Sequence, residues 1–193
     1  MAHCNGSFTI LAFFFSLAFL TAIKSETMFA RELSARDQFR LKPEKMTHLR
    51  FYLHDTVTGQ HPTAMPVAQA ATTNTSATLF GIVTVMDDPL TVSPDLNSTL
   101  VGRAQAICAS SSSRSGMSLT MTMNLVFTEG AYNGSTLSVL GQNPILKNPR
   151  ELTIVGGTGI FRFARGYVQL RTHTFNIKTR NAIVKYDAYA SHY

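Results

Sequence analysis

The chain has no tryptophan, only two cysteines and few charged residues, which account for 15% of its 193 positions. Cys4 belongs to an amino-terminal segment that we expect to be removed on export, so Cys108 has no partner within the chain and a disulfide framework is excluded. Hydrophobic residues make up 45% of the sequence, which is too many for a disordered chain. We therefore expect one folded domain that is stabilised by its hydrophobic core and its backbone pairing.

Patterns typical of metal and nucleotide sites are missing as well. The six histidines and two cysteines show no HxH, HExxH or CxxC spacing, and we predict no metal site. The glycine-rich segment 156–159 lacks the lysine of a phosphate loop and is followed by a strand-like run, so we interpret it as a turn between strands. The basic residues give a formal net charge of +6 but are scattered among acids, which argues against nucleic-acid binding.

The longest apolar run lies at the amino terminus, from Phe8 to Ile23. It is typical of a secretory signal peptide, and we assign residues 1–25 to one, with cleavage after Ala22 or Ser25. An uncleaved anchor is the alternative, because no lysine or arginine precedes the run. No later run is long enough to cross a membrane, so the mature chain is expected to be secreted and extracellular. Three N-glycosylation sequons agree with export, and they begin at Asn74, Asn97 and Asn133.

The rest of the chain divides into a lead-in and a patterned domain. Residues 26–46 mix charges of both signs without a period and are interpreted as a flexible segment, and residues 47–193 form the predicted domain. The domain alternates apolar and polar residues with period two, which is typical of β-strands. Eight strands are expected, in the regions 46–57, 78–86, 100–109, 117–128, 136–140, 152–155, 167–175 and 182–190.

The connections between these strands are short, and no amphipathic helix separates them. Both features favour an antiparallel sheet over a parallel one, so the predicted fold class is all-β. A closed eight-stranded antiparallel barrel leaves no edge strand exposed, and its interior is wide enough for one small ligand. We prefer this barrel, with a β-sandwich as the alternative.

The first predicted strand carries an acid at the end of its apolar face. Leu49, Phe51, Leu53 and Asp55 share this face. If the face lines a cavity, burial raises the pKa of Asp55 and allows it to act as a general acid near neutral pH. The alternative is that Asp55 ends its strand and caps the following turn.

Three other charged residues are ambiguous from the sequence. Arg165 is either a cation in the pocket or a surface residue beside Gly166. The adjacent acids Asp87 and Asp88 could form a carboxylate dyad, but they precede Pro89, and we interpret them as a solvated turn at a strand end.

Six segments, in the same order and spread over nearly the whole mature chain, resemble the dirigent family of secreted plant proteins. They are FYLHDTVTG (51–59), LFGIVTVMDDPLT (79–91), LVGRAQAI (100–107), FTEGAYNGSTLSVLGQNP (127–144), ELTIVGGTGIFRFARGY (151–167) and YDAYASHY (186–193). The resemblance implies an eight-stranded antiparallel barrel that is secreted to the apoplast. It also implies a homotrimer or homodimer, one pocket in each barrel, and no cofactor.

Proteins of this family impart stereoselectivity on the coupling of phenoxy radicals, typically from monolignols such as coniferyl alcohol, into optically active lignans. A separate laccase or peroxidase makes the radicals, so the implied partners are phenolic small molecules and that oxidase. The protein supplies orientation, and a difference of about 1.4 kcal/mol between competing transition states already gives a tenfold preference. Stereoselective monolignol coupling is the first function that the resemblance implies.

The motifs of the family also assign residues. Asp55 corresponds to the aspartate of FYLHD and Arg165 to the arginine of FARG, and the resemblance implies catalytic roles for both. The expected pocket residues are Phe51, Leu53, Cys108 and Ile160.

Two of these positions depart from lignan-forming relatives. Ile160 stands where a second aspartate often follows GGTG, and Cys108 stands where those relatives often have a tyrosine. A pocket with one acid is less suited to protonating both halves of a bis-quinone methide. The MDDPLT and RFARGY forms resemble the branch that includes pterocarpan synthases, which dehydrate an isoflavanol through a quinone methide. A lyase of this type is the alternative function.

Overall fold

A computed structural model describes residues 43–114 and 116–193, which form an all-β domain. Its strands are β1 (Lys45–Asp55), β2 (Ala64–Ala68), β3 (Val83–Thr91), β4 (Leu100–Ser110), β5 (Leu119–Phe127), β6 (Thr136–Asn143), β7 (Arg150–Thr158), β8 (Arg165–Phe175) and β9 (Ala182–His192). Three short 3₁₀ turns lie in the connections: η1 (Thr73–Thr75), η2 (Gly130–Tyr132) and η3 (Gly159–Phe161). No helix in this part of the chain is long and apolar enough to span a membrane.

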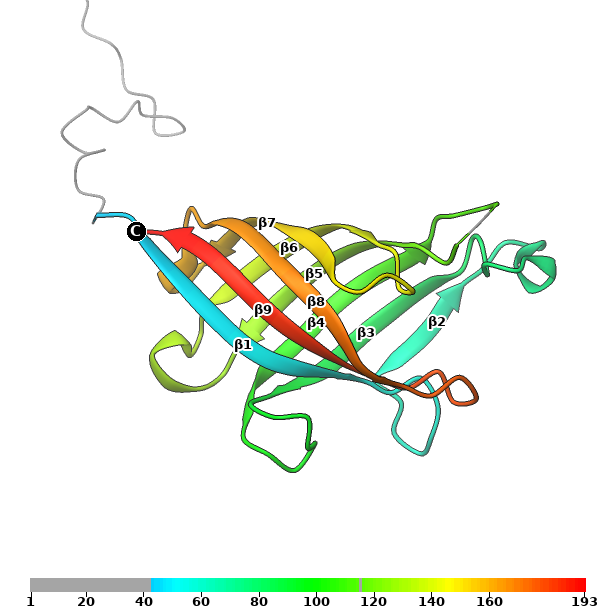
Figure 1. The fold of residues 1–193 in the computed structure, drawn as a ribbon, viewed down its shortest axis with the longest axis horizontal. Coiled ribbons are helices and arrows are strands. Elements are labelled where there is room, and N and C mark those ends of the chain that lie inside the picture. The colour runs from blue at the N-terminus through cyan, green and yellow to red at the C-terminus, as the bar shows by residue number, and fades with distance from the viewer. Residues whose placement is uncertain (1–42, 115) are drawn as a thin grey trace, which may run out of the picture. The chain divides into compact units, whose positions relative to one another are not determined.

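Eight of the strands close into an antiparallel barrel (Figure 1). Neighbouring strands follow the order β1-β9-β8-β7-β6-β5-β4-β3, and the ring closes through two residue pairs between β1 and β3. These pairs are Tyr52 with Thr91 and Leu53 with Leu90. The short strand β2 pairs with the first part of β3 beside this closure. The predicted eight-stranded antiparallel barrel is confirmed, with β2 as an addition to it.

Strand β3 differs from its prediction over residues 78–86, because it runs through Asp87, Asp88 and Pro89. Proline is tolerated there because β3 exchanges β2 for β1 as its neighbour at this point. The backbone N–H of Asp87 still donates to the carbonyl oxygen of Thr63 at 2.8 Å, and pairing with β1 begins only beyond Pro89. The interpretation of Asp87 and Asp88 as a turn at a strand end is therefore wrong.

The amino-terminal predictions lie mostly outside the described residues. The signal peptide, residues 1–25, and the part of the flexible segment up to residue 42 belong there. Strand β1 begins at Lys45, two residues ahead of the expected start of the domain at 47. The sequence does not predict β2, because four of its five residues are exposed and Pro66 interrupts its pattern.

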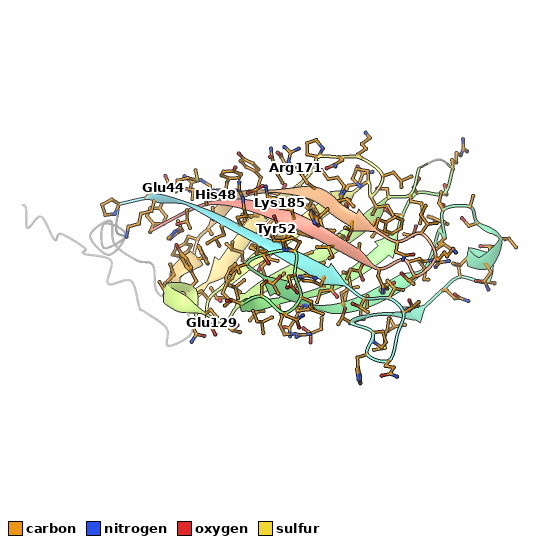
Figure 2. The ribbon with its side chains drawn as sticks, turned by 60° about the horizontal axis from the view of Figure 1, so that its bottom comes forward. Glu44, His48, Tyr52, Glu129, Arg171 and Lys185 are labelled. Atoms are coloured by element: carbon orange, nitrogen blue, oxygen red, sulfur yellow. The ribbon has the colours of Figure 1, made fainter. Side chains whose placement is uncertain are left out.

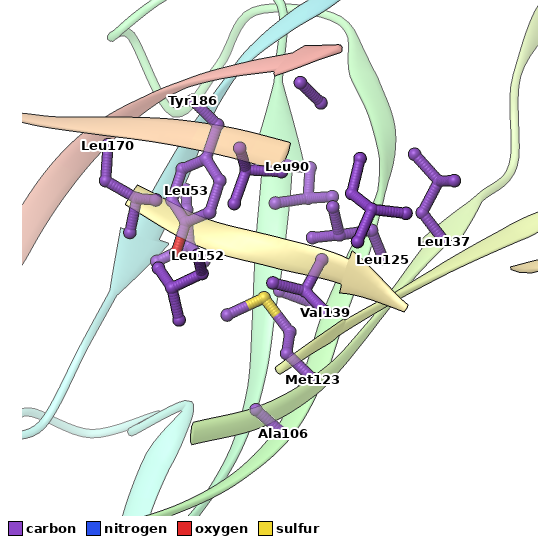
Figure 3. Close-up of a cluster of buried hydrophobic side chains, with 14 of the residues drawn as sticks. Leu53, Leu90, Ala106, Met123, Leu125, Leu137, Val139, Leu152, Leu170 and Tyr186 are labelled. Carbon is purple, nitrogen blue, oxygen red and sulfur yellow. The ribbon is translucent and has the colours of Figure 1, made fainter. Parts of the chain in front are cut away.

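Side chains alternate between the interior of the barrel and its outer surface along each strand. Inside, Tyr186 from β9 lies beside Leu53 from β1 and Leu170 from β8 (Figure 3). Outside, polar side chains such as His48 and Lys185 project from β1 and β9 (Figure 2). The period-two pattern thus separates a hydrophobic interior from a polar surface.

Aromatic rings fill one end of the barrel. The turns η2 and η3 contribute Tyr132 and Phe161, whose rings stack with centroids 5.3 Å apart. Phe127 packs against both rings, and His192 meets Phe161 edge-on at 5.0 Å. Because these side chains pack into the interior at this end, open space in the barrel is left toward the opposite end.

Candidate active-site cavity

The barrel contains a cavity of about 560 Å³ at the end away from the aromatic rings. This volume falls in the range that holds a drug-sized ligand. The lining comes from strands β1 to β9 and from the connections that follow β1, β2, β4, β6 and β8. Exposed side chains from these connections, among them Leu146 and Arg180, also line the cavity, so it is accessible from the surface.

The cavity wall is rich in sulfur. Met86, Met117, Met121 and Cys108 line it, and the Sγ atom of Cys108 lies 3.8 Å from the Sδ atom of Met86. Thioethers are flexible and make favourable contacts with aromatic rings, so this wall suits a planar aromatic guest. Burial raises the pKa of the Cys108 thiol to about 11, which keeps it protonated at neutral pH. Cys108 therefore contributes packing surface to the cavity and no thiolate nucleophile.

Asp55 lines this cavity at the end of β1. Its Oδ1 atom is buried and has no hydrogen-bond partner among the described residues. Burial raises the pKa of Asp55 from its ordinary value of 3.8 to about 6. The carboxyl group thus holds a proton at a higher pH than a solvated aspartate does.

Asp88 on β3 is a second buried acid; it has no exposed surface and is not part of the cavity lining. The hydroxyl of Thr63 donates to its Oδ1 atom at 2.5 Å, whereas its buried Oδ2 atom has no partner among the described residues. Burial, followed by the charge of Asp55, raises the pKa of Asp88 to about 7. The adjacent Asp87 points outward and pairs with Arg103, with 2.7 Å between Nε and Oδ1.

The strand register explains why these two acids meet. Leu53 pairs with Leu90, and two further steps along each strand lead to Asp55 and Asp88. Inward-facing residues recur every second position, so the two carboxyl groups enter the same section of the interior. Near neutral pH such a pair holds its protons jointly, so Asp55, which lines the cavity, can both donate a proton and take one back.

Polar groups on the far side of the cavity complete the lining. Tyr186 is almost fully buried, and its phenol carries a raised pKa, chiefly because of burial. The charges of Arg150, Asp88 and Asp55 all act on this phenol. Asn143 and Thr172 line the same part of the cavity.

The structure brings three of the six predicted catalytic and pocket residues to the cavity: Leu53, Asp55 and Cys108. Phe51 lies in the core next to it, with its ring stacked on Tyr186 at 5.5 Å. Ile160 lies in η3, in the connection from β7 to β8 that also supplies Phe161 to the aromatic rings, and is not part of the lining.

Arg165 also lies apart from the cavity lining. Its side chain is 63% exposed at the start of β8, and its Nη2 atom pairs with Oε1 of Glu44 at 2.5 Å. The same carboxylate accepts a hydrogen bond from the hydroxyl of Ser191. The structure therefore does not bring Arg165 together with Asp55, and a ligand contact by Arg165 is not supported by this geometry.

The three predicted glycosylation sites are exposed asparagines in connections between strands. Asn97 lies between β3 and β4, and Asn133 lies between β5 and β6. Both are at the end of the barrel that the aromatic rings fill. Asn74 lies in η1, between β2 and β3. Glycans at Asn97 and Asn133 would leave the cavity end of the barrel uncovered.

Sequence reasoning missed Asp88, although its signal was present. Asp88 has the same parity as Met86 and Leu90, and both of these face inward. The proline that follows and the neighbouring acid are typical of a turn, and the prediction of a turn rests on them instead of on this alternation. For Arg150 no signal was available, because it lies just ahead of the strand expected at 152–155. Within the described part of the chain, no cluster of three His, Cys, Asp or Glu side chains could hold a metal ion.

Comparisons with known proteins agree on one family. A family model described as Dirigent-like protein matches residues 46–191. The chain is 50% identical over 151 residues to Dirigent protein 21 of Arabidopsis thaliana, which covers 78% of this chain and 79% of that protein. It is 49% identical over 153 residues to Pterocarpan synthase 1 of Glycine max, with 79% and 82% covered. The solved structure of the pterocarpan synthase dirigent protein GePTS1 superposes with a TM-score of 0.73 at 47% identity, over 78% of this chain and 86% of that one.

Proposed function

Because the chain belongs to the dirigent family, we propose that it binds a phenolic substrate in the barrel cavity and closes a ring in that substrate through a quinone methide. The proposed reaction is the dehydration of an isoflavanol, as in the pterocarpan synthases that are among its relatives. The observation that carries the proposal is the buried pair of Asp55 and Asp88. Asp55 lines the cavity and Asp88 lies buried next to it outside the lining, so Asp55 can face the substrate while Asp88 shares its proton near neutral pH.

The pair can perform both proton transfers of such a reaction. The protonated carboxyl donates its proton to the benzylic hydroxyl, the carbon–oxygen bond breaks, and water leaves. The electron pair of the substrate's ionised phenol oxygen forms the carbonyl of the quinone methide. A second phenol of the substrate then attacks the methide carbon and gives its proton to the carboxylate, which restores the pair, while the carbonyl oxygen becomes a phenolate again.

Stereocontrol comes from the cavity wall. The substrate is held in one orientation by the sulfur-rich and aliphatic lining, so the second phenol can reach only one face of the methide carbon. A preference of tenfold requires only about 1.4 kcal/mol between the two transition states.

Stereoselective coupling of monolignol radicals is the second candidate. It is supported by the wide, largely apolar and methionine-rich cavity, which can adapt to two aromatic guests. The acids, however, lie beside each other on β1 and β3, and this placement suits one reacting centre better than the two ends of a bis-quinone methide. We therefore place isoflavanol dehydration first and radical coupling second, which reverses the order that the family resemblance implies. The separate oxidase and the trimer or dimer remain predictions from the family resemblance.

Substrate requirement separates the two functions. Purified protein should convert an isoflavanol alone into one enantiomer of a pterocarpan, measured by chiral chromatography, and Asp55→Asn should abolish this turnover. Handed lignans formed only from coniferyl alcohol with laccase, and no turnover of the isoflavanol, would establish radical coupling instead. Binding of a phenolic without either reaction, with an affinity unchanged in Asp55→Asn, would indicate a carrier.

A further inference from the structure

Arg150, the first residue of β7, is a buried cation in the cavity lining. Arg150 is only 5% exposed. The Nη1 atom donates to the hydroxyl of Thr172 at 2.8 Å and to the carbonyl oxygens of Lys147 at 3.0 Å and Ile145 at 3.4 Å. These three acceptors are neutral, so they fix the position of the guanidinium without compensating its charge.

The remaining nitrogens of this guanidinium have no protein acceptor among residues 43–114 and 116–193. The Nε atom of Arg150 is buried and unpartnered, and no carboxylate in this range lies within ion-pair distance of the group. Burial lowers the pKa of Arg150, and the nearby phenol of Tyr186 opposes this effect. A buried charge is costly unless an opposite charge accompanies it, so the group is set up for an anionic partner from outside the protein.

A buried amide accompanies Arg150. In the pairing of β6 with β7, Val139 lies opposite Ile154. Continuing this register by four positions places Asn143 opposite Arg150. Asn143 also lines the cavity, is 6% exposed, and has an unpartnered Oδ1 atom, while its Nδ2 atom makes only a weak contact to the sulfur of Met121 at 3.0 Å. Its amide N–H₂ is therefore a second donor with no strong acceptor.

The two polar regions lie on different parts of the cavity wall. Arg150 is on β7 and Asp55 is on β1, and the two strands between them are β8 and β9. The register leads from Arg150 through Leu170 and Tyr186 to Phe51, four residues ahead of Asp55. The path along the wall therefore combines about 14 Å across three strand spacings with about 13 Å along β1, and a straight line through the cavity is shorter. One aromatic ligand can therefore place its reacting carbon at Asp55 and a phenol oxygen at Arg150.

We propose that Arg150, assisted by Asn143, forms a subsite that binds the ionised phenol oxygen of the substrate, across the aromatic ring from the reacting benzylic carbon. This inference rests on the proposed function. In the first step the phenolate supplies the electron pair that forms the quinone methide, and in the second it receives that pair back. Arg150 favours the phenolate over the neutral phenol in the bound state, and so provides the form that can expel water.

The ionisation of a bound probe tests this subsite directly. 4-Nitrophenol absorbs differently as phenol and as phenolate, so titration of the complex with the wild-type protein shows at which pH the bound probe ionises. We expect the bound probe to ionise at lower pH than free 4-nitrophenol. We also expect its methyl ether, 4-nitroanisole, to bind about ten- to a hundred-fold more weakly than the phenolate, the loss typical of one charge-assisted hydrogen bond.

Variants of Arg150 test whether this residue causes the preference for the phenolate. Arg150→Gln should remove the preference for the phenolate, and Arg150→Lys should restore part of it. The matched control is Arg171→Gln, which changes an exposed arginine of β8 outside the cavity lining and should leave the preference intact. An unchanged phenolate preference in a folded Arg150→Gln protein would overturn the proposal.

Two further outcomes are informative. If Arg150→Gln does not fold, the wild-type titration alone decides, because a bound probe that ionises at the same or a higher pH than the free one contradicts an anion subsite. Asp55→Asn separates this inference from the proposed function, since it should stop ring closure yet keep phenolate binding. Turnover of the isoflavanol without any phenolate preference would refute the subsite and leave the reaction standing.

Discussion

Asp55 and Asp88 lie at facing positions on β1 and β3, inside the barrel, and share no counter-ion among the described residues. The arrangement arises where β1 closes the barrel against β3 and β2 begins. Thr63, just ahead of β2, donates to one carboxyl group of the pair, and an oxygen of each acid stays without a partner. A single structural junction therefore provides both proton-transfer groups of the proposed reaction.

The acid pair should make stability depend on pH. In the unfolded chain an aspartate releases its proton near its ordinary pKa of 3.8, whereas folded Asp88 releases it at about 7. Between these values the folded protein holds a proton that the unfolded chain has lost, so stability falls as the pH rises through this window. Between about pH 4 and about pH 8, the wild type should lose up to about 4 kcal/mol relative to Asp88→Asn, as measured by urea unfolding.

The control for this experiment is Asp87→Asn. Asp87 is the exposed neighbour that pairs with Arg103 on the outer surface, so its removal should change stability by less than about 1 kcal/mol and should leave the pH dependence in place. Parallel pH curves for the wild type and Asp88→Asn would show that Asp88 is ordinarily ionised, contrary to the structure.

Arg165 should contribute little to ligand binding. Its guanidinium is largely exposed and pairs with Glu44 near the start of β1. Arg165→Gln should therefore cost less than about 1 kcal/mol of stability and leave the affinity for a phenolic ligand unchanged, as measured by thermal unfolding and calorimetric titration. A loss of affinity of tenfold or more would mean that Arg165 reaches the ligand, as the family resemblance implies.

Ile160→Asp should not add a further catalytic acid to Asp55 and Asp88. Ile160 is 42% exposed in η3 and lies outside the cavity lining, so a carboxylate at this position would be largely solvated and have an ordinary pKa. We expect no gain in lignan coupling when coniferyl alcohol and laccase are supplied, judged by the enantiomeric excess of the product. A clear gain would show that this turn closes over a ligand.

Gly166 should be irreplaceable for a steric reason. Its φ of +148° is unfavourable for other residues, and a Cβ atom there would collide with the carbonyl oxygen of Tyr189 on β9. Gly166→Ala should lower the free energy of unfolding by more than about 3 kcal/mol, measured by denaturant titration. Gly156→Ala is the matched control, because no atom lies within 4 Å of the Cβ position there. Equal stabilities of the two variants would contradict this packing.

Much of the barrel can be predicted from the sequence because period two is a strong signal. The alternation around Leu53 and around Met121 assigns the inward faces of β1 and β5, and it places Asp55 in the interior. The same signal runs through Met86, Asp88 and Leu90. Proline and paired acids usually mark turns, however, and only the change of neighbour along β3 explains why the strand continues.

The rest of the site depends on long-range pairing that no local pattern encodes. Arg150 and Asn143 meet through the register of β6 with β7, and Asp55 meets Asp88 through the closure of the barrel. Arg165 shows the opposite case, because its motif is conspicuous in the sequence while its side chain lies at the surface. Membership of a motif therefore does not establish that a residue faces the cavity.

The most direct test of the account is a titration of the aspartate carboxyl groups by carbon NMR, with Asp55→Asn and Asp88→Asn to assign the signals. We expect two carboxyl resonances in the wild type that titrate near neutral pH, at about 6 and about 7, and a lower pKa for Asp88 once the charge of Asp55 is removed. If both groups titrate close to the ordinary value of 3.8, the cavity holds no proton at neutral pH and the proposed acid–base chemistry is contradicted.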